Sequence, residues 1–329
     1  MTSDRSKYAL RGVLEGQLGP VTSIAVHPLG TYVASGGECL ILQSPSKIYR
    51  VLPSFQGEEG TKIWHLPSAK LLETPAGASD RGYTMAVVWI TKPDDAEEGI
   101  AFGTDDGYLC VWRRNGVNFT EVFSKRLTGG VEGQEISSMA YDPSSGHLGI
   151  VHRSEVVHRF IIDGAMWPIL VKSVAIPKHW PQAVVFGQSG VRGPELWTFG
   201  REDGVIHILN DNGQVILKSK DTGTVIGHAA INMKEDALIL DDVSQGIALY
   251  KLSGTERLKT FSIPHSERRS RNVAFHDGAS TVICGSDHGK IYIFDRRTGK
   301  INDTIHVGVK EWVQSIAVSK GIDRDAQGF

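Results

Sequence analysis

The sequence has too few cysteines for a disulfide framework. Cys39, Cys110 and Cys284 lie far apart in 329 residues, and none of them belongs to a metal-binding spacing. A small, odd number of isolated cysteines argues against a stapled fold and against a zinc site, and it is typical of a reducing compartment. We therefore expect the protein in the cytoplasm, the nucleus or both.

Long hydrophobic runs and an excess of either charge are also missing. No apolar run approaches the roughly 20 residues that cross a bilayer. Residues 1–11 mix charged and polar side chains and lack the apolar core of a signal peptide. The net charge is −2 at pH 7, which leaves no basic surplus to bind a phosphate backbone. We expect no membrane insertion and no nucleic-acid binding.

Motifs of catalysis are absent as well. The sequence contains no H-E-x-x-H, C-x-x-C, Walker glycine loop or G-x-S-x-G. The glycine-rich stretch 187–193 is not followed by the helix start that a phosphate site needs. His152 and His158 could approach each other across a turn, but no third metal ligand accompanies them. We expect no enzymatic activity, no cofactor and no metal ion.

What the sequence does contain is a repeat of short strands. A G-x-x-x-G turn followed by an apolar strand occurs at Gly103–Gly107, Gly200–Gly204 and Gly285–Gly289. The spacing from Gly204 to Gly246 is 42 residues and from Gly246 to Gly289 is 43. Periods of about 40 to 50 residues with four strands each are typical of propeller blades.

The apolar runs can be aligned as the first strands of seven blades. These runs are Val21 to Val26, Met85 to Trp89, Ile136 to Tyr141, Ala183 to Phe186, Gly227 to Ile231, Asn272 to Phe275 and Val313 to Val318. Continuous apolar runs such as 237–240 and 281–284 predict inner strands that are covered on both faces. We predict an all-β β-propeller of four-stranded blades, with a seven-blade plan, an incomplete last blade and hence six to seven blades.

The segment 16–30, GQLGPVTSIAVHPLG, resembles the opening of a WD repeat, with Gln17 where a histidine is usual. Ala34-Ser35-Gly36-Gly37 and Ile63-Trp64 are similar to the second and third strands of that family. The resemblance extends from about residue 16 to residue 318 and is strongest in blades one, two and six. It implies a WD-repeat scaffold or adaptor that binds a protein or peptide.

The chain departs from the family in its polar residues. WD repeats share a buried hydrogen-bonded set of His, Ser/Thr, Asp and Trp, and we expect no blade here to complete it. In blade two only Asp106 and Trp112 match, and in blade six His288 and Phe294 stand at the Asp and Trp positions. We therefore expect apolar packing to hold the blades together more than these networks do.

We expect residues 1–329 to form a single β-propeller domain, and two segments depart from its blade pattern. Residues 39–58 form an insertion in blade one, because their removal would restore the G-x-x-x-G spacing. The insertion is either an intron retained in the transcript or a genuine long loop, and transcript sequencing would decide between them. Residues 319–329 form a C-terminal tail, which leaves blade seven without its later strands; residues 8–14 could supply an outer strand.

In the WD-repeat family, the loops that enter first strands and the turns before third strands form the face that most often meets partners. The residues of this sequence that we expect to bind a protein there are Tyr83, His179, Trp180, Arg201, Arg268, Arg269, Arg271 and Trp312. Trp, Tyr and Arg are over-represented among interface hot spots. One alternative is a reader of acidic or phosphorylated peptides that uses the Arg268, Arg269 and Arg271 cluster. Another is a propeller hydrolase with a central metal.

Overall fold

The strands of the described residues form six antiparallel sheets of four. The structure is a computed structural model. It describes residues 8, 12–15, 17, 20–37, 60–74, 81–92, 98–127, 134–190, 193–210, 215–254, 256–264, 267–308 and 312–319. The expected insertion at 39–58 and the tail at 319–329, apart from Ser319, lie outside these residues. Within them, no helix is long and apolar enough to span a membrane.

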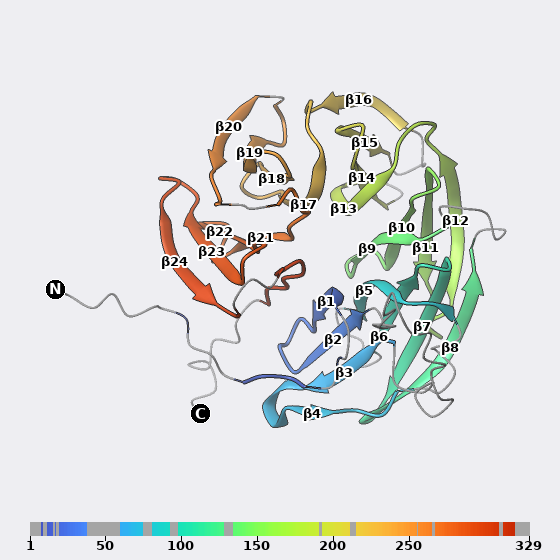
Figure 1. Ribbon diagram of the computed structural model, residues 1–329. Coiled ribbons are helices and arrows are strands. Elements are labelled where there is room, and N and C mark those ends of the chain that lie inside the picture. Colours follow the sequence, from blue (N-terminus) through green and yellow to red (C-terminus); the bar gives the residue numbers. More distant parts are fainter. Residues whose placement is uncertain are drawn as a thin grey trace, which may run out of the picture.

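Each sheet is one blade. Blade one consists of β1 (Val21–Val26), β2 (Tyr32–Gly37), β3 (Lys62–His65) and β4 (Lys70–Leu71), and blade two of β5 (Thr84–Thr91), β6 (Glu98–Thr104), β7 (Tyr108–Asn115) and β8 (Asn118–Arg126). Blade three consists of β9 (Ile136–Asp142), β10 (His147–His152), β11 (Val156–Ile162) and β12 (Pro168–Ala175), and blade four of β13 (Pro181–Gly190), β14 (Gly193–Gly200), β15 (Val205–Leu209) and β16 (Val215–Asp221). Blade five consists of β17 (Ile226–Asn232), β18 (Ala237–Asp242), β19 (Gly246–Lys251) and β20 (Arg257–Phe261), and blade six of β21 (Val273–His276), β22 (Thr281–Cys284), β23 (Lys290–Asp295) and β24 (Ile301–His306). Strands pair in chain order, and the blades form a ring with their first strands innermost (Figure 1).

Apolar packing between neighbouring blades forms the core, as predicted. Between blades two and three, Leu109 and Phe123 pack with Ile136 and Leu148, and similar clusters fill the four other blade contacts from blade one to blade six. The inner strands β18 and β22 are buried along their whole length. Full burial of one such aliphatic side chain contributes about 1.5–3 kcal/mol, so these contacts dominate the stability of the ring.

The G-x-x-x-G repeat has a clear structural reason. Its second glycine, Gly107 in blade two, has a φ of +77°, a left-handed conformation that closes the turn between the second and third strands. Its first glycine, Gly103, lies so close to blade three that an added Cβ would be 2.4 Å from Cγ2 of Ile136. The repeat therefore combines a turn requirement with a close approach of adjacent blades.

A recurring hydrogen bond links neighbouring first strands. Thr22 Oγ1 donates to the carbonyl oxygen of Thr84 at 2.6 Å, and Ser137 Oγ donates to the carbonyl oxygen of Pro181 at 2.6 Å. In both cases the second residue in the first strand of one blade donates to the carbonyl oxygen of the first residue in the first strand of the next blade. The same bond therefore marks a first-strand position.

Residues 312–319 occupy such a position between blades six and one, although no strand is assigned to them. The backbone N–H of Asn272 donates to the carbonyl oxygen of Gln314 at 3.2 Å. Gln314 Nε2 donates to the carbonyl oxygen of Val21 at 2.7 Å, which is the recurring link between blades. The described residues thus form six complete blades, and the segment that we expected to open blade seven lies between blades six and one.

Candidate interaction face

First strands begin, and turns to third strands occur, at the same end of the ring. We call this end the entry face; its exposed or half-exposed residues discussed below are Arg153, Trp180, Arg201, Arg268, Arg269 and Trp312. A central cavity of about 710 Å³ runs along the first strands. Its lining includes Glu135, Arg153, Arg201 and Trp312, which all come from the entry face. A ligand on this face can therefore contact both the turns and the channel.

Trp180 and Arg201 lie together at a smaller cavity between blades three and four. This cavity has a volume of about 250 Å³ and is lined by Arg153, Trp180, Pro181, Gln182, Arg201 and Glu202. Trp180 is 44% exposed, and its carbonyl oxygen accepts a hydrogen bond from the backbone N–H of Arg201 at 2.9 Å. Because Arg201 forms no ion pair with the described residues, its guanidinium is available to a ligand beside an aromatic wall.

Trp312 and Arg269 form a second aromatic–cation pair on the entry face. The guanidinium carbon of Arg269 lies 5.1 Å from the centre of the Trp312 ring, which is within cation–π range. Trp312 Nε1 donates to the carbonyl oxygen of Ser270 at 3.0 Å, which fixes the ring orientation. Arg269 also pairs with Glu267. The pair is preformed and adjoins the central cavity.

His179 does not belong to the exposed surface. It is 1% exposed; its Nδ1 bonds with Asp203 at 2.7 Å and its Nε2 with Thr198 at 3.0 Å. His207 packs edge-on against it, with ring centroids 4.4 Å apart. Blade four therefore contains a buried His–Thr–Asp hydrogen-bond network of the kind found in WD repeats, whereas Leu209 stands at the Trp position, six residues after Asp203. The proposed role of His179 in partner contact is wrong, because both ring nitrogens are used inside the blade.

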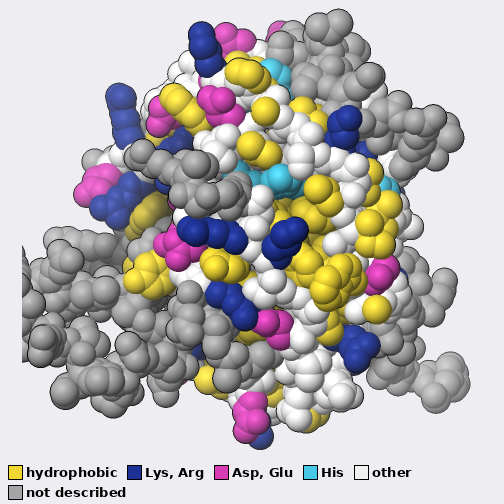
Figure 2. Space-filling view, turned by 90° about the vertical axis from the view of Figure 1, so that its right-hand side faces the viewer, with side chains coloured by type: hydrophobic (Ala, Val, Ile, Leu, Met, Phe, Trp, Pro, Cys, Tyr) yellow, Lys and Arg dark blue, Asp and Glu magenta, His cyan; other side chains and the backbone are white. Residues whose placement is uncertain are grey.

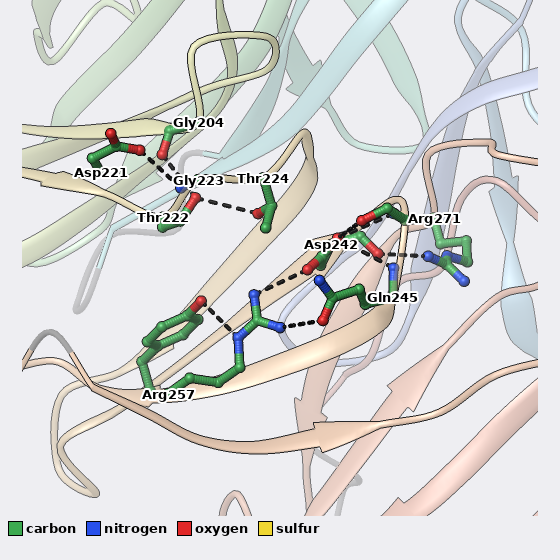
Figure 3. Close-up of polar contacts among 11 residues, drawn as sticks. Gly204, Asp221, Thr222, Gly223, Thr224, Asp242, Gln245, Arg257 and Arg271 are labelled. Carbon is green, nitrogen blue, oxygen red and sulfur yellow. Dashed lines mark hydrogen bonds and ion pairs between the residues drawn. The ribbon is translucent and has the colours of Figure 1, made fainter.

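Arg271 is also buried, and the expected arginine cluster is divided. Its backbone N–H and Nε donate to the two carboxylate oxygens of Asp241, at 2.6 and 2.8 Å, and Nη2 donates to the carbonyl oxygen of Asp242 at 3.0 Å. Asp242 receives a second arginine, Arg257, from the opposite side (Figure 3). Arg271 therefore joins blades five and six, and the hypothesis of an acidic-peptide reader loses one of its three cations.

The two remaining predicted residues differ in exposure. Tyr83 is half-buried, and its backbone N–H donates to Asp105 Oδ1 at 2.6 Å, so that the backbone of Tyr83 closes a turn of blade two. Arg268 is exposed and forms no ion pair with any described residue. Arg268 thus remains available on the entry face, whereas Tyr83 offers only part of its ring.

The channel lining does not favour the hydrolase alternative. Among the described residues, Glu135 is the single carboxylate in the lining, and it pairs with Arg153 at 3.1 Å. The other polar side chains in the lining are hydroxyls, amides, the imidazole of His228, the indole of Trp312 and the guanidinium groups of Arg153, Arg201 and Arg271. A central metal held by inward carboxylates, as that alternative requires, has no matching donor set in this part of the chain.

Two groups of residues bring histidine rings close together. Ligand atoms of His179, Asp203 and His207 all lie within 4.8 Å of one another, but the existing hydrogen bonds of His179 occupy both of its nitrogens. His152 and His158 do approach across their turn, with ring centroids 5.0 Å apart and edge to face. Burial lowers the pKa of His158 to about 4, so this ring is neutral at pH 7 and packs as part of the blade interior.

One residue of the entry face was missed at the sequence level. Arg153 lies in the turn before the third strand of blade three and lines both the central and the smaller cavity. The rule that selected Arg201, its counterpart in blade four, would also have selected Arg153. The weak repeat signal in blade three concealed that equivalence.

Comparison with known families agrees with the geometry. The family model described as "WD domain, G-beta repeat" matches residues 9–42, which include the first two strands of blade one. A search of curated proteins finds no match. The matched repeat lies in a ring of four-stranded blades, and in blades two, four, five and six the third strand begins at or directly after a glycine with positive φ. The described residues form a β-propeller of six four-stranded blades, and its first blade contains a match to the WD repeat.

Proposed function

We propose that this protein is a non-catalytic scaffold or adaptor that binds a protein or peptide on its entry face. WD-repeat propellers serve in general as protein-interaction scaffolds. The observation that carries the proposal for this chain is the cavity bordered by Trp180 and Arg201. It combines an exposed aromatic ring with a guanidinium that forms no ion pair with any residue that the structure describes, next to the mouth of the channel.

The chemistry of the entry face supports contact with a polypeptide. Tryptophan and arginine are among the side chains most enriched in binding hot spots, and two such combinations border the central cavity or its neighbour, Trp180 with Arg201 and Trp312 with Arg269. The hydrogen bond from Trp312 Nε1 to the carbonyl oxygen of Ser270 holds the Trp312 ring in place. Ordering of this ring therefore costs little additional entropy when a partner binds.

Affinity capture from native extract tests the proposal, with wild type compared with Trp180→Ala and Arg201→Glu. Truncation of a hot spot costs at least about 2 kcal/mol, which corresponds to roughly a 30-fold weaker Kd. We expect both variants to lose the same partner while their thermal unfolding stays that of wild type, because both side chains are at the surface.

Matched control variants lie at the opposite end of the ring. Leu29 is 58% exposed in the turn between β1 and β2, and Arg297 is exposed in the turn between β23 and β24. Leu29→Ala and Arg297→Glu should retain every partner. Retention of all partners by Trp180→Ala and Arg201→Glu, or equal loss in the controls, would show that the entry face is not the binding surface.

We also propose a cytoplasmic or nuclear location. Cys110 and Cys284 are both free and buried in the blades, as is usual for proteins of reducing compartments. Microscopy of the tagged protein tests this, and a secretory or organellar distribution would contradict it.

A further inference from the structure

The outermost strand of blade three exposes an unusual number of large apolar side chains. Trp167 is 50% exposed, Ile169 52%, Leu170 53% and Val171 46%. These four side chains fall within five residues, whereas the other exposed apolar side chains among the described residues are mostly scattered singly. We call Trp167, Ile169, Leu170 and Val171 the β12 patch. Figure 2 views the side of the molecule on which β8 and β12 lie, and hydrophobic side chains gather on that side.

Other outer strands carry charges where β12 does not. β8 exposes Glu121, Lys125 and Arg126, and β20 places Leu258 between Arg257 and Lys259. Charges of this kind normally protect a sheet edge from association with other chains. Lys172 is the single charged residue in β12. Because side chains alternate along a strand, these residues cover both faces of the outer edge of blade three. An apolar strand edge without charge protection is open to association with another chain.

The β12 patch is held rigidly before any partner binds. The backbone N–H of Trp167 donates to Asp163 Oδ1 at 2.7 Å, and the Trp167 ring packs edge to face against Phe123 of blade two, with centroids 5.0 Å apart. β12 is also paired with β11 from end to end, with one bulge. Little conformational entropy would therefore be lost on docking.

We propose that the β12 patch is a homodimer interface, in which a second copy of this chain docks through the same patch about a two-fold axis. A two-fold interface requires a surface that complements itself, and an apolar patch with almost no charge meets this requirement. With the two β12 strands antiparallel and centred on Leu170, Ile169 faces Val171 of the second copy. Lys172 then lies near the Trp167 ring of the second copy, where a cation is favourable.

The size of the patch predicts a weak dimer. Half-exposed tryptophan and aliphatic side chains of this number offer roughly 300–400 Å² per copy, the size of a typical functional patch. With the surrounding rim, two copies would bury about 1,000 Å², which is at the low end of specific interfaces. We expect association in the micromolar range and no obligate dimer.

Sedimentation of the purified full chain tests the proposal between about 1 and 200 µM, a range that brackets micromolar affinity. The mass of wild type should rise with concentration from 35.9 kDa towards twice that value. Leu170→Lys and Val171→Lys should each remain monomeric throughout. Leu258→Lys is the matched control, because Leu258 is 49% exposed on the outer strand of blade five, and it should dimerise like wild type.

Thermal unfolding of the three variants should match that of wild type, since all three positions are half-exposed. Two variants at neighbouring positions keep the test decisive if one of them folds poorly. A wild type that stays monomeric over the whole range would overturn the proposal, as would variants of the β12 patch that dimerise normally. A monomeric wild type that binds a different protein through β12 would equally overturn it.

Discussion

Arg271→Ala should destabilise the fold and should not act by removing a partner contact. Asp241 is 0% exposed and Arg271 only 4%, and the guanidinium donates to Asp241 Oδ1 at 2.8 Å and to the carbonyl oxygen of Asp242 at 3.0 Å. Truncation would leave a buried carboxylate without its cation. Breaking a buried ion pair in this way costs about 3–5 kcal/mol, against a total stability of about 5–15 kcal/mol for a typical domain.

The destabilisation should depend on pH. Burial raises the pKa of Asp241 to about 6 even with Arg271 present, and loss of the guanidinium should raise it further. A folded-state pKa above the unfolded value means that the folded state binds the proton more tightly, so stability falls as the pH rises through that range. The difference between wild type and Arg271→Ala should therefore be larger at pH 8 than at pH 5.

Urea unfolding followed by tryptophan fluorescence measures this effect. Arg268→Ala is the control, because an exposed arginine outside any ion pair with the described residues should change stability by less than about 0.5 kcal/mol. The double variant Arg271→Met with Asp241→Leu should recover most of the loss, since it leaves no unpaired charge. An Arg271→Ala protein that unfolds like wild type at both pH values would refute the role of this pair in joining blades five and six.

Three further predictions concern the blades and their closure. Burial lowers the pKa of His158 to about 4, below its unfolded value; stability should therefore fall as the pH drops below about 6.5, and wild type should lose about 2 kcal/mol more than His158→Phe between pH 7 and pH 5 in urea unfolding. Gly103→Ala should cost about 1–3 kcal/mol by forcing a Cβ against Ile136, and an unchanged unfolding midpoint would contradict the close approach of the blades. Gln314→Ala should cost about 1 kcal/mol by removing the bond to the carbonyl oxygen of Val21; hydrogen exchange at β1 that stays as slow as in wild type would contradict its role in ring closure.

The sequence pattern predicted the β-propeller fold, because each blade consists of strands and turns that follow one another in the chain. The runs 136–141 and 281–284 become β9 and β22 nearly residue for residue, since alternating turns and buried strands leave their pattern in neighbouring residues. The glycine repeat likewise located the turns between second and third strands, because Gly107 and Gly289 need positive φ. Even the first-strand position of 313–318 followed from its apolar pattern.

Exposure and pairing of polar side chains were decided only by the tertiary structure. His179 and Trp180 are adjacent in the same loop, yet one is buried against Asp203 and the other is 44% exposed. Arg271 finds its partner on Asp241, 30 positions earlier in the chain. Such partners come from different strands and blades, and the sequence around a residue does not indicate which residues of the neighbouring blade pack against it. The sequence by itself determined the ring of blades, whereas contacts between blades decided which residues face a partner.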